Sequence, residues 1–450
     1  MKRIFFLLFI TLWSKLALCE ERPWYSGFWE TEGYGYIFSI QNDTAIIFEK
    51  TSESCLKSGL SSGRLMGAES NSVRYFNVSI PGFIDAKMEL YKHSDTNQIT
   101  FHRNDTNTKM LAKRLRKVPE ACFIPPNPKE ALKVFIQNFR EHYPFLSRYP
   151  ELTYMSSSES RLLNSKPLFN EMTNILKVLN DPHTALVAPD IEQLFFGNEL
   201  PNRNAPSSQA LKKISQRVFD NYLVGPYTVL NDQMRIGELE AGLIYLAIDG
   251  FSGLSKQGTA AAEKLALNTA AVQILDVLKG STGLIIDVRA HSGGSDKLGV
   301  LLASNFTAQD YIAYRKQFVV NGGLKPTWKE GAPIKVSSVG SKAWLGKIVL
   351  LTSSATVSAG EAFVMALNQR TPKVIKVGNK TRGSFSDMLP RTLPNGWLFA
   401  LPNERYLDSD GESYDFVGIP PDKVINEVLT GFTNNNQDSA MEEAIRLLLR

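Results

Sequence analysis

The spacing of hydrophobic positions changes along the chain, and each change predicts a different kind of structure. Between residues 23 and 117, short apolar runs alternate with polar turns, as in antiparallel hairpins. The clearest hairpins are residues 34–50, which turn at Gln-Asn-Asp, and residues 87–103, which turn at Ser-Asp-Thr-Asn. We therefore expect a small antiparallel β module, a barrel or a sandwich, over residues 20–117.

In residues 118–189 the hydrophobic positions have the spacing of an α-helix. Residues 127–143 begin with Asn127 as a helix N-cap, followed by a proline at the first helical position. Residues 167–180 place their apolar side chains on one helical face. These patterns predict a helical segment between the β module and the rest of the chain.

The next change of pattern separates a weakly patterned stretch from an α/β region. Residues 190–241 contain many Asn, Pro and Ser residues, so we expect a linker or insert with one short helix near residues 208–222. From residue 242, buried-strand patterns alternate with helical patterns. This alternation predicts a mostly parallel sheet with crossover helices over residues 242–430.

The C-terminal residues 431–450 complete the predicted architecture with a helix. Ser439 and Glu442 have the spacing of a capping box at its start. The whole pattern predicts a multidomain α/β protein in which an antiparallel β module and a helical segment precede an α/β core.

Residues 1–19 have the layout of a secretory signal peptide. Lys2 and Arg3 precede an apolar run that is too short to span a bilayer, and small residues favour cleavage after Cys19. A lipoprotein acylated at Cys19 is the alternative, although Leu18 is an unusual residue before such a cysteine. No other segment has a transmembrane pattern. We expect a soluble protein exported to the periplasm or the extracellular space.

Two cysteines, Cys55 and Cys122, remain after this cleavage. An even pair in an oxidising compartment suggests one disulfide, and two buried free thiols are an equally good interpretation. The pair does not have the spacing of a zinc site. The net charge of +5 in 450 residues is mild. With no basic run, this charge does not indicate a nucleic-acid partner.

Ser358 lies at a junction where a serine can have two roles. Ser358 and Glu361 have capping-box spacing, and the apolar residues that follow predict a buried helix. The run before Ser358 predicts a buried strand, and several hydrolases hold a nucleophile at such a strand–turn–helix junction. Ser358 is therefore either only a helix cap or also a nucleophile.

A serine nucleophile needs a general base, and the chain has five histidines. Three of them, His93, His102 and His142, fall at positions typical of surface residues. His291 stands beside a glycine-rich turn that we expect to be flexible. His183 follows a helix end at an Asn-Asp-Pro turn, where a side chain is presented to solvent, although a loop histidine is commonly only a surface residue.

Two places in the sequence can supply backbone N–H donors for an oxyanion. Gly293 and Gly294 follow a buried strand, and such glycines let N–H groups turn toward a ligand. Ala359 begins the helix after Ser358, so its N–H would complete a two-donor oxyanion hole. An ordinary Gly-Gly turn is the alternative.

Four separated segments resemble motifs of the S41 serine peptidases, the family of tail-specific proteases, tricorn protease and interphotoreceptor retinoid-binding protein. In the family's order they are residues 177–186 (KVLNDPHTAL), 284–294 (LIIDVRAHSGG), 354–363 (SATVSAGEAF) and 414–422 (YDFVGIPPD). The resemblance covers roughly residues 125–430 and leaves out the β module. It implies a crotonase/ClpP-like α/β catalytic core.

The resemblance also implies roles for individual residues. Ser358 would be the nucleophile and His183 the general base. The oxyanion hole would consist of backbone N–H groups from Ala359 and from Gly293 or Gly294.

Three departures from the family pattern bear on the mechanism. Ser384 stands where processing proteases carry a lysine base, and Arg382 cannot replace that base because guanidinium stays protonated. Asp415 stands where the tricorn-like branch has a glutamate that helps to orient the histidine, and its shorter side chain reaches less far. The interval from His183 to Gly242 is short for an inserted PDZ domain.

These features predict an exported serine endopeptidase that cleaves unfolded proteins or peptides through a Ser-His-acid site, without a metal or organic cofactor. Two alternatives stay open: a non-catalytic ligand-binding protein on the same fold, like the family's retinoid carrier, and a hydrolase of non-peptide esters. The β module is expected to bind substrate, a partner or the cell envelope, and to gate the site. Family members often form homo-oligomers, although this sequence shows no interface signature.

Overall fold

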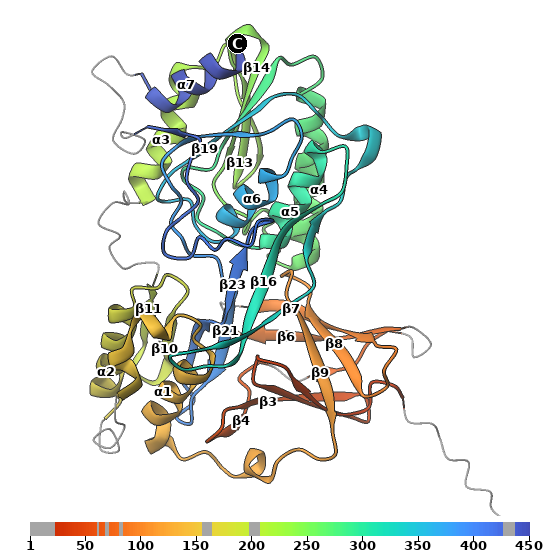
Figure 1. Ribbon diagram of the computed structural model, residues 1–450, viewed down its shortest axis with the longest axis vertical. Coiled ribbons are helices and arrows are strands. Elements are labelled where there is room, and N and C mark those ends of the chain that lie inside the picture. Colours follow the sequence, from red (N-terminus) through yellow and green to blue (C-terminus); the bar gives the residue numbers. More distant parts are fainter. Residues whose placement is uncertain are drawn as a thin grey trace, which may run out of the picture.

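The computed structural model describes residues 23–60, 63–67, 72–80, 84–154, 164–197, 208–425 and 437–450. The expected signal peptide and Cys19 lie outside these residues. Figure 1 shows the β module at the lower right, a layer of helices and strands at the lower left, and the α/β core above them. No helix in the described ranges is long and apolar enough to cross a membrane.

The β module is one antiparallel sheet with strand order β4-β3-β2-β1-β9-β8-β7-β6, in which β5 also pairs with β3. Both predicted hairpins are confirmed, because β2 pairs with β3 and β7 pairs with β8. Asn42 and Asp43 make the first turn with positive φ angles. The strands are β1 (Gly27–Thr31), β2 (Tyr36–Gln41), β3 (Thr44–Lys50), β4 (Cys55–Lys57), β5 (Gly63–Arg64), β6 (Val73–Ile80), β7 (Ile84–Lys92), β8 (Gln98–Arg103) and β9 (Lys109–Leu115).

Large aromatic side chains fill the core of this module. Trp29, Phe38, Phe76 and Phe101 are fully buried, and Phe38 stacks on Phe101 with ring centroids 3.8 Å apart. The alternation that predicted the strands places these residues on the same side of the sheet, since successive side chains point to opposite faces. The module therefore has its own hydrophobic core.

Two of the three histidines expected at the surface are buried, so that prediction was wrong for them. The His102 ring, on β8, bonds Glu89 and the carbonyl of Thr106. His142, at the end of the first long helix, packs against Gly35 of the β module. Burial lowers the pKa of His142 to about 3, so the ring stays neutral. Contacts between distant segments bury both rings, and local spacing does not reveal such contacts.

A disulfide joins Cys55, on β4, to Cys122, in the turn after β9. Of the two alternatives left open by the sequence, the structure contains the bond. The two cysteines are 67 residues apart in sequence. The bond ties one edge of the β module to the start of the helical segment.

The two helices predicted in residues 118–189 are present, and Figure 1 shows them together at the lower left. Asn127 caps a short 3-10 turn that leads into the first helix, as the sequence predicted. Asn180 ends the second helix in the left-handed conformation. The helices are α1 (Ala131–His142) and α2 (Ser165–Leu179).

These helices cover a four-stranded sheet that the sequence analysis did not expect. Its order is β11-β10-β22-β21, so two strands near residue 190 pair with two strands near residue 395. Phe135 and Phe139 of α1 pack on Phe399 of β22. The strands are β10 (Ala185–Ala188), β11 (Gln193–Phe196), β21 (Met388–Thr392) and β22 (Leu398–Pro402).

The predicted α/β core contains a seven-stranded sheet with order β12-β13-β14-β15-β19-β20-β24. The last five strands are parallel, which confirms the expected mostly parallel sheet. Residues 190–241 are more than a linker, because β13 pairs antiparallel with β14 and β12 pairs antiparallel with β13 at the edge of the sheet. The strands are β12 (Thr228–Asn231), β13 (Met234–Glu238), β14 (Leu243–Ile248), β15 (Gly283–Asp287), β19 (Ile348–Thr352), β20 (Ile375–Gly378) and β24 (Lys423–Val424).

Helices cover both faces of this sheet. On one face, the apolar side chains of the sheet pack against α4, α5 and α6. On the other face, they pack against α3 and α7. The last helix begins after Asp438, whose carboxylate accepts the N–H groups of Ala440 and Met441, so Ser439 is not its N-cap. The helices are α3 (Ser208–Asn221), α4 (Ala260–Val277), α5 (Asp296–Ala303), α6 (Ala359–Asn368) and α7 (Ser439–Leu448).

A long strand connects the α/β core with the β module, as Figure 1 shows. This strand, β16, carries Tyr314 in the hydrophobic core under α5 and α6, and Phe318 in the core of the β module. It pairs with three further strands, so the two parts share one continuous framework. The strands are β16 (Tyr311–Asn321), β17 (Thr327–Glu330), β18 (Ile334–Val336) and β23 (Glu404–Leu407).

Candidate active site

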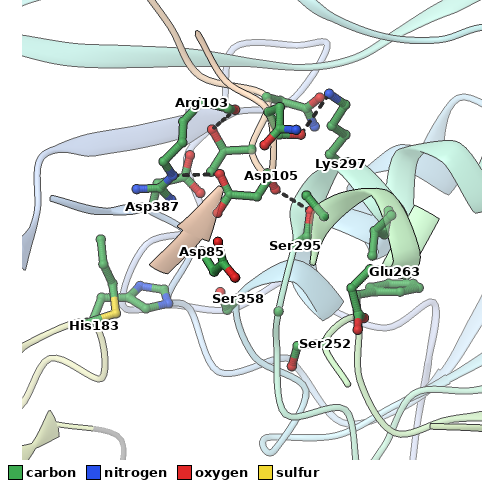
Figure 2. A pocket seen from close by; sticks show the side chains of 18 of the residues that line it. Asp85, Arg103, Asp105, His183, Ser252, Glu263, Ser295, Lys297, Ser358 and Asp387 are labelled. Atoms are coloured by element: carbon green, nitrogen blue, oxygen red, sulfur yellow. Dashed lines mark hydrogen bonds and ion pairs between the residues drawn. The ribbon is translucent and has the colours of Figure 1, made fainter. Parts of the chain in front are cut away.

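Ser358 lies where strand β19 passes into helix α6, as the sequence predicted. Its backbone has φ of 57° and ψ of −121°, a conformation that residues other than glycine rarely adopt. A serine held in a strained strand-to-helix turn is typical of a hydrolase nucleophile. Its side chain is half-buried and lies at the pocket shown in Figure 2.

Glu361 links the turn at Ser358 to the loop at residues 381–384. It is fully buried, and its carboxylate accepts the N–H of Ser358 at 3.2 Å. It also accepts the Thr381 hydroxyl at 2.6 Å and the N–H groups of Gly383 and Ser384 at 2.6 and 2.8 Å. Burial raises the pKa of Glu361 to about 8, against hydrogen bonds that favour the carboxylate. The sequence identified Glu361 only as a capping partner, and this wider role depends on a loop twenty residues away.

His183 enters the same site from the turn after α2. Its ring is buried at the edge of the pocket, so the expectation of a side chain presented to solvent was wrong. The Asp181 carboxylate accepts the backbone N–H of His183 at 2.9 Å, and the hydroxyl of Tyr143 donates to Asp181 at 3.0 Å. These bonds fix the turn that presents the imidazole. Burial lowers the pKa of His183, although the charge of Asp181 opposes this shift, so the ring is neutral at pH 7, as a general base must be.

The Nδ1 atom of His183 lies 3.0 Å from the hydroxyl oxygen of Ser384. The peptide group of Ser384 is also fixed, because its N–H donates to Glu361 and its carbonyl accepts the N–H of Ser358 at 3.0 Å. One short loop therefore contacts the serine turn and the histidine ring together. The sequence showed Ser384 only as the residue in place of a lysine base. The sequence did contain a signal for this contact: a residue with a small hydroxyl side chain, Ser384, stands at the position of the lysine base.

Asp415 lies near His183 without a recorded hydrogen bond to it. Both residues line a cavity of about 160 Å³ that also includes Asp181 and Ser384. The Asp415 carboxylate accepts the hydroxyl of Ser413 at 2.7 Å, and burial raises the pKa of Asp415 to about 7. The structure thus brings Asp415 to the histidine's neighbourhood, and Ser384 occupies the place next to Nδ1.

The Gly-Gly turn passes beside the candidate nucleophile. Gly293 and Gly294 have φ angles of 103° and 118°. A Cβ added to Gly293 would lie 3.1 Å from Cβ of Ser358 and 3.6 Å from its Oγ. The Gly293 N–H donates to Nδ1 of His291 at 3.1 Å. Within the described part of the chain, no acceptor is recorded for the N–H groups of Gly294 and Ala359.

Two further groups, the His291 ring and the Arg289 guanidinium, support this turn. His291 is fully buried under Gly360, so the expected flexible position was wrong, and burial lowers the pKa of His291 to about 3. Arg289 forms buried ion pairs of 2.7 Å with Asp287 and Asp438. These contacts hold the end of β15, from which the Gly-Gly turn begins.

The pocket that Ser358 and His183 share has a volume of about 890 Å³. Apolar residues of β10, β21 and β22 line it, together with residues of α4, α5 and the β module. A pocket of this size accommodates several side chains of a peptide. Among the described residues, no group of three His, Cys, Asp or Glu side chains is placed to hold a metal ion.

Comparison with known proteins points to one family. The model of peptidase family S41 matches residues 242–425. No curated protein matches the chain. A solved structure from Parabacteroides merdae, provisionally described as a peptidase, is 23% identical with a TM-score of 0.56, and the alignment covers 72% of this chain and 97% of that one.

A second solved structure, the photosystem II D1 C-terminal processing protease, is 14% identical with a TM-score of 0.43. Its alignment covers 72% of this chain and 97% of the protease. The Parabacteroides merdae structure shares the fold of this chain, and the match at residues 242–425 includes the serine turn and the Gly-Gly turn. These findings place residues 242–425 in peptidase family S41 and support a serine-type peptidase.

Proposed function

We propose that this chain is an exported serine endopeptidase that hydrolyses peptide bonds in unfolded proteins or peptides. The observation that carries the proposal is the pocket shared by Ser358 and His183, in which Ser384 contacts Nδ1 of the histidine. The strained turn at Ser358 supports the same assignment. So do the N–H groups of Ala359 and Gly294, which have no acceptor among the residues that the structure describes.

The proposed reaction begins with proton transfer to His183. When Nδ1–H donates to Ser384, Nε2 keeps its lone pair and accepts the proton of the Ser358 hydroxyl. The Ser358 oxygen attacks the substrate carbonyl carbon, and the N–H groups of Ala359 and Gly294 bind the resulting oxyanion. The imidazolium then protonates the leaving nitrogen, so the C–N bond breaks and an acyl-enzyme remains. Water, activated by the same histidine, releases the acid and restores Ser358.

The proposal assigns different roles to the two glycines and to the two groups near Nδ1. Gly293 gives its N–H to His291 and therefore shapes the turn, whereas Gly294 is the oxyanion donor. Ser384 positions His183. Asp415, which bonds Ser413, acts on the histidine only through the charge it carries above about pH 7.

Export is part of the proposal. The Cys55–Cys122 disulfide supports it, because such bonds persist in oxidising compartments. The signal-like residues 1–19 give independent support from the sequence.

An open pocket with an apolar side also suits an extended, unfolded chain better than a folded surface.

Labelling with a fluorophosphonate tests the catalytic assignment. The mature wild-type protein is expected to be labelled and to cleave casein, and Ser358→Ala and His183→Ala are expected to lose both activities. Ser252→Ala is a matched control, because Ser252 is an exposed serine that lines the same pocket.

Two other results would change the assignment. A folded wild-type protein that neither reacts with the probe nor cleaves casein would favour a ligand-binding protein on this fold. Faster turnover of small esters than of peptides would favour an esterase-like hydrolase.

A further inference from the structure

The β module forms one wall of the active-site pocket. Residues from the end of β6, from β7 and from the turn between β8 and β9 line the same pocket as Ser358 and His183. Figure 2 shows Asp85, Arg103 and Asp105 of this module around the pocket. A substrate bound at the serine therefore meets the β module as well as the α/β core.

Several hydrogen bonds hold this wall against the core. The hydroxyl of Ser295 donates to the carbonyl of Asp105 at 2.5 Å, and the amino group of Lys297 donates to the carbonyl of Asn104 at 3.1 Å. The hydroxyl of Thr108 donates to Asp387 at 2.7 Å. Figure 2 draws the contacts of Ser295 and Lys297 as dashed lines. These contacts make the turn between β8 and β9 a fixed part of the pocket.

Most carboxylates that line the pocket already have strong partners. Four of them are engaged in this way: Asp105 with Arg103, Asp387 with Lys316 and Thr108, Glu263 with the N–H groups of Leu254 and Ser255, and Glu89 with Tyr91 and His102. A carboxylate engaged in this way has little capacity left for a substrate cation.

Asp85 is different from these four. It lies at the start of β7, opposite Ser79 of β6, and its side chain is exposed. Within the described ranges, no hydrogen bond or ion pair is recorded for its carboxylate. Figure 2 shows the side chain directed into the pocket. Asp85 thus offers a carboxylate to a bound ligand.

The positive charges of the pocket lie on other elements, and one of them, Arg103 on β8, is already paired with Asp105. Lys264, Lys297 and Lys335 belong to α4, α5 and β18, and burial together with the nearby charge of Lys264 lowers the pKa of Lys297. A basic substrate residue would be disfavoured beside these lysines and favoured beside Asp85. Charge preference should therefore depend on the position of the residue in the substrate.

We propose that Asp85 is a specificity residue that selects a lysine or arginine side chain at one substrate position. This inference rests on the proposed peptidase function and adds the class of substrate. The ammonium or guanidinium group would pair with an exposed carboxylate, where such a pair changes kcat/KM by roughly two- to five-fold.

Internally quenched peptides that carry Lys, norleucine or Glu at each position in turn test this assignment. The wild type is expected to cleave the Lys peptide roughly two- to five-fold faster than the norleucine peptide at one position. Asp85→Asn is expected to remove this ratio, and Asp85→Lys to shift the preference to Glu. Lys264→Met removes a charge from the opposite wall and is expected to keep the ratio. An unchanged ratio in Asp85→Asn would overturn the proposal.

Binding to the Ser358→Ala variant separates this inference from the proposed function. Fluorescent versions of the same peptides are titrated into Ser358→Ala and into the double variant Ser358→Ala/Asp85→Asn. Tighter binding of the Lys peptide only when Asp85 is present supports the inference even if the wild type cleaves no peptide. Equal binding to both variants, with both folded by circular dichroism, would overturn it.

Discussion

Removal of the Ser384 hydroxyl tests how His183 is held. In Ser384→Ala the contact of 3.0 Å to Nδ1 of His183 is lost, and the ring can rotate or adopt the other tautomer. A hydrogen bond between neutral groups contributes about 1 kcal/mol, and one to a charged group about 1.5–3 kcal/mol. The imidazole becomes charged during proton transfer, so the bond strengthens in the transition state. We therefore expect kcat to fall roughly 10- to 100-fold.

The expected loss is confined to kcat. Ser384 does not line the large pocket, so KM should change little. The N–H of Ser384 still bonds Glu361 in the alanine variant, because this bond belongs to the backbone, and the loop should keep its shape. Steady-state kinetics on a quenched peptide give both constants, and circular dichroism reports on the fold.

Three further variants make the result decisive. Ser384→Thr keeps a hydroxyl and should recover part of the activity, whereas Ser252→Ala, at an exposed serine of the pocket, should behave like the wild type. Asp415→Asn should lower kcat by less than Ser384→Ala does, since Asp415 bonds Ser413 instead of the histidine. The reasoning is refuted if Ser384→Ala stays within about two-fold of the wild type while Asp415→Asn loses about 100-fold or more.

The pH profile of kcat/KM should rise through a pKa below 6.5, because burial lowers the pKa of His183 and only the neutral ring can accept the serine proton; a midpoint well above 7 would contradict this. In Cys55→Ser/Cys122→Ser, loss of a 67-residue cross-link should lower the free energy of unfolding by about 4 kcal/mol, which urea titration of both proteins measures. Gly294→Ala should lose most activity, because its Cβ would lie 2.3 Å from the backbone of Phe251. Gly258→Ala is its control, since this glycine also has a positive φ but open space around it; equal activities would contradict the role of Gly294.

Local patterns predicted the elements that depend on neighbours in sequence. The turn at Asn42 and Asp43 and the junction at Ser358 follow from residues within a few positions of each other. Strands β15 and β19 could also be predicted from neighbouring residues, because a strand buried on both faces has apolar residues at nearly every position. Such features can be recognised from one sequence.

The same local patterns did not predict contacts between segments that are distant in sequence. β10 pairs with β22 across more than two hundred residues, and its apolar spacing does not name that partner. The contact between His183 and Ser384 spans 201 residues, and the sequence left Asp415 as the expected partner of the histidine. Side-chain reach and loop placement decide these contacts, and only the folded chain specifies them.

The β module is too closely joined to the core to be studied by deletion. Its Tyr34 donates to the buried Glu404 at 2.8 Å, and its Thr108 contacts Glu404 and Lys316 at 2.9 and 3.0 Å. Phe318 of β16 packs in the core of the module.

A chain without residues 23–117 would expose Phe318 and leave Glu404 and Lys316 with fewer partners in a buried site, at a cost of several kcal/mol. Loss of activity in that deletion would therefore report on folding as much as on substrate binding. Asp85 is exposed and has no recorded contact to the core in the described ranges, so its substitution leaves these bonds in place. A changed peptide preference in Asp85→Asn can then be attributed to the wall of the pocket itself.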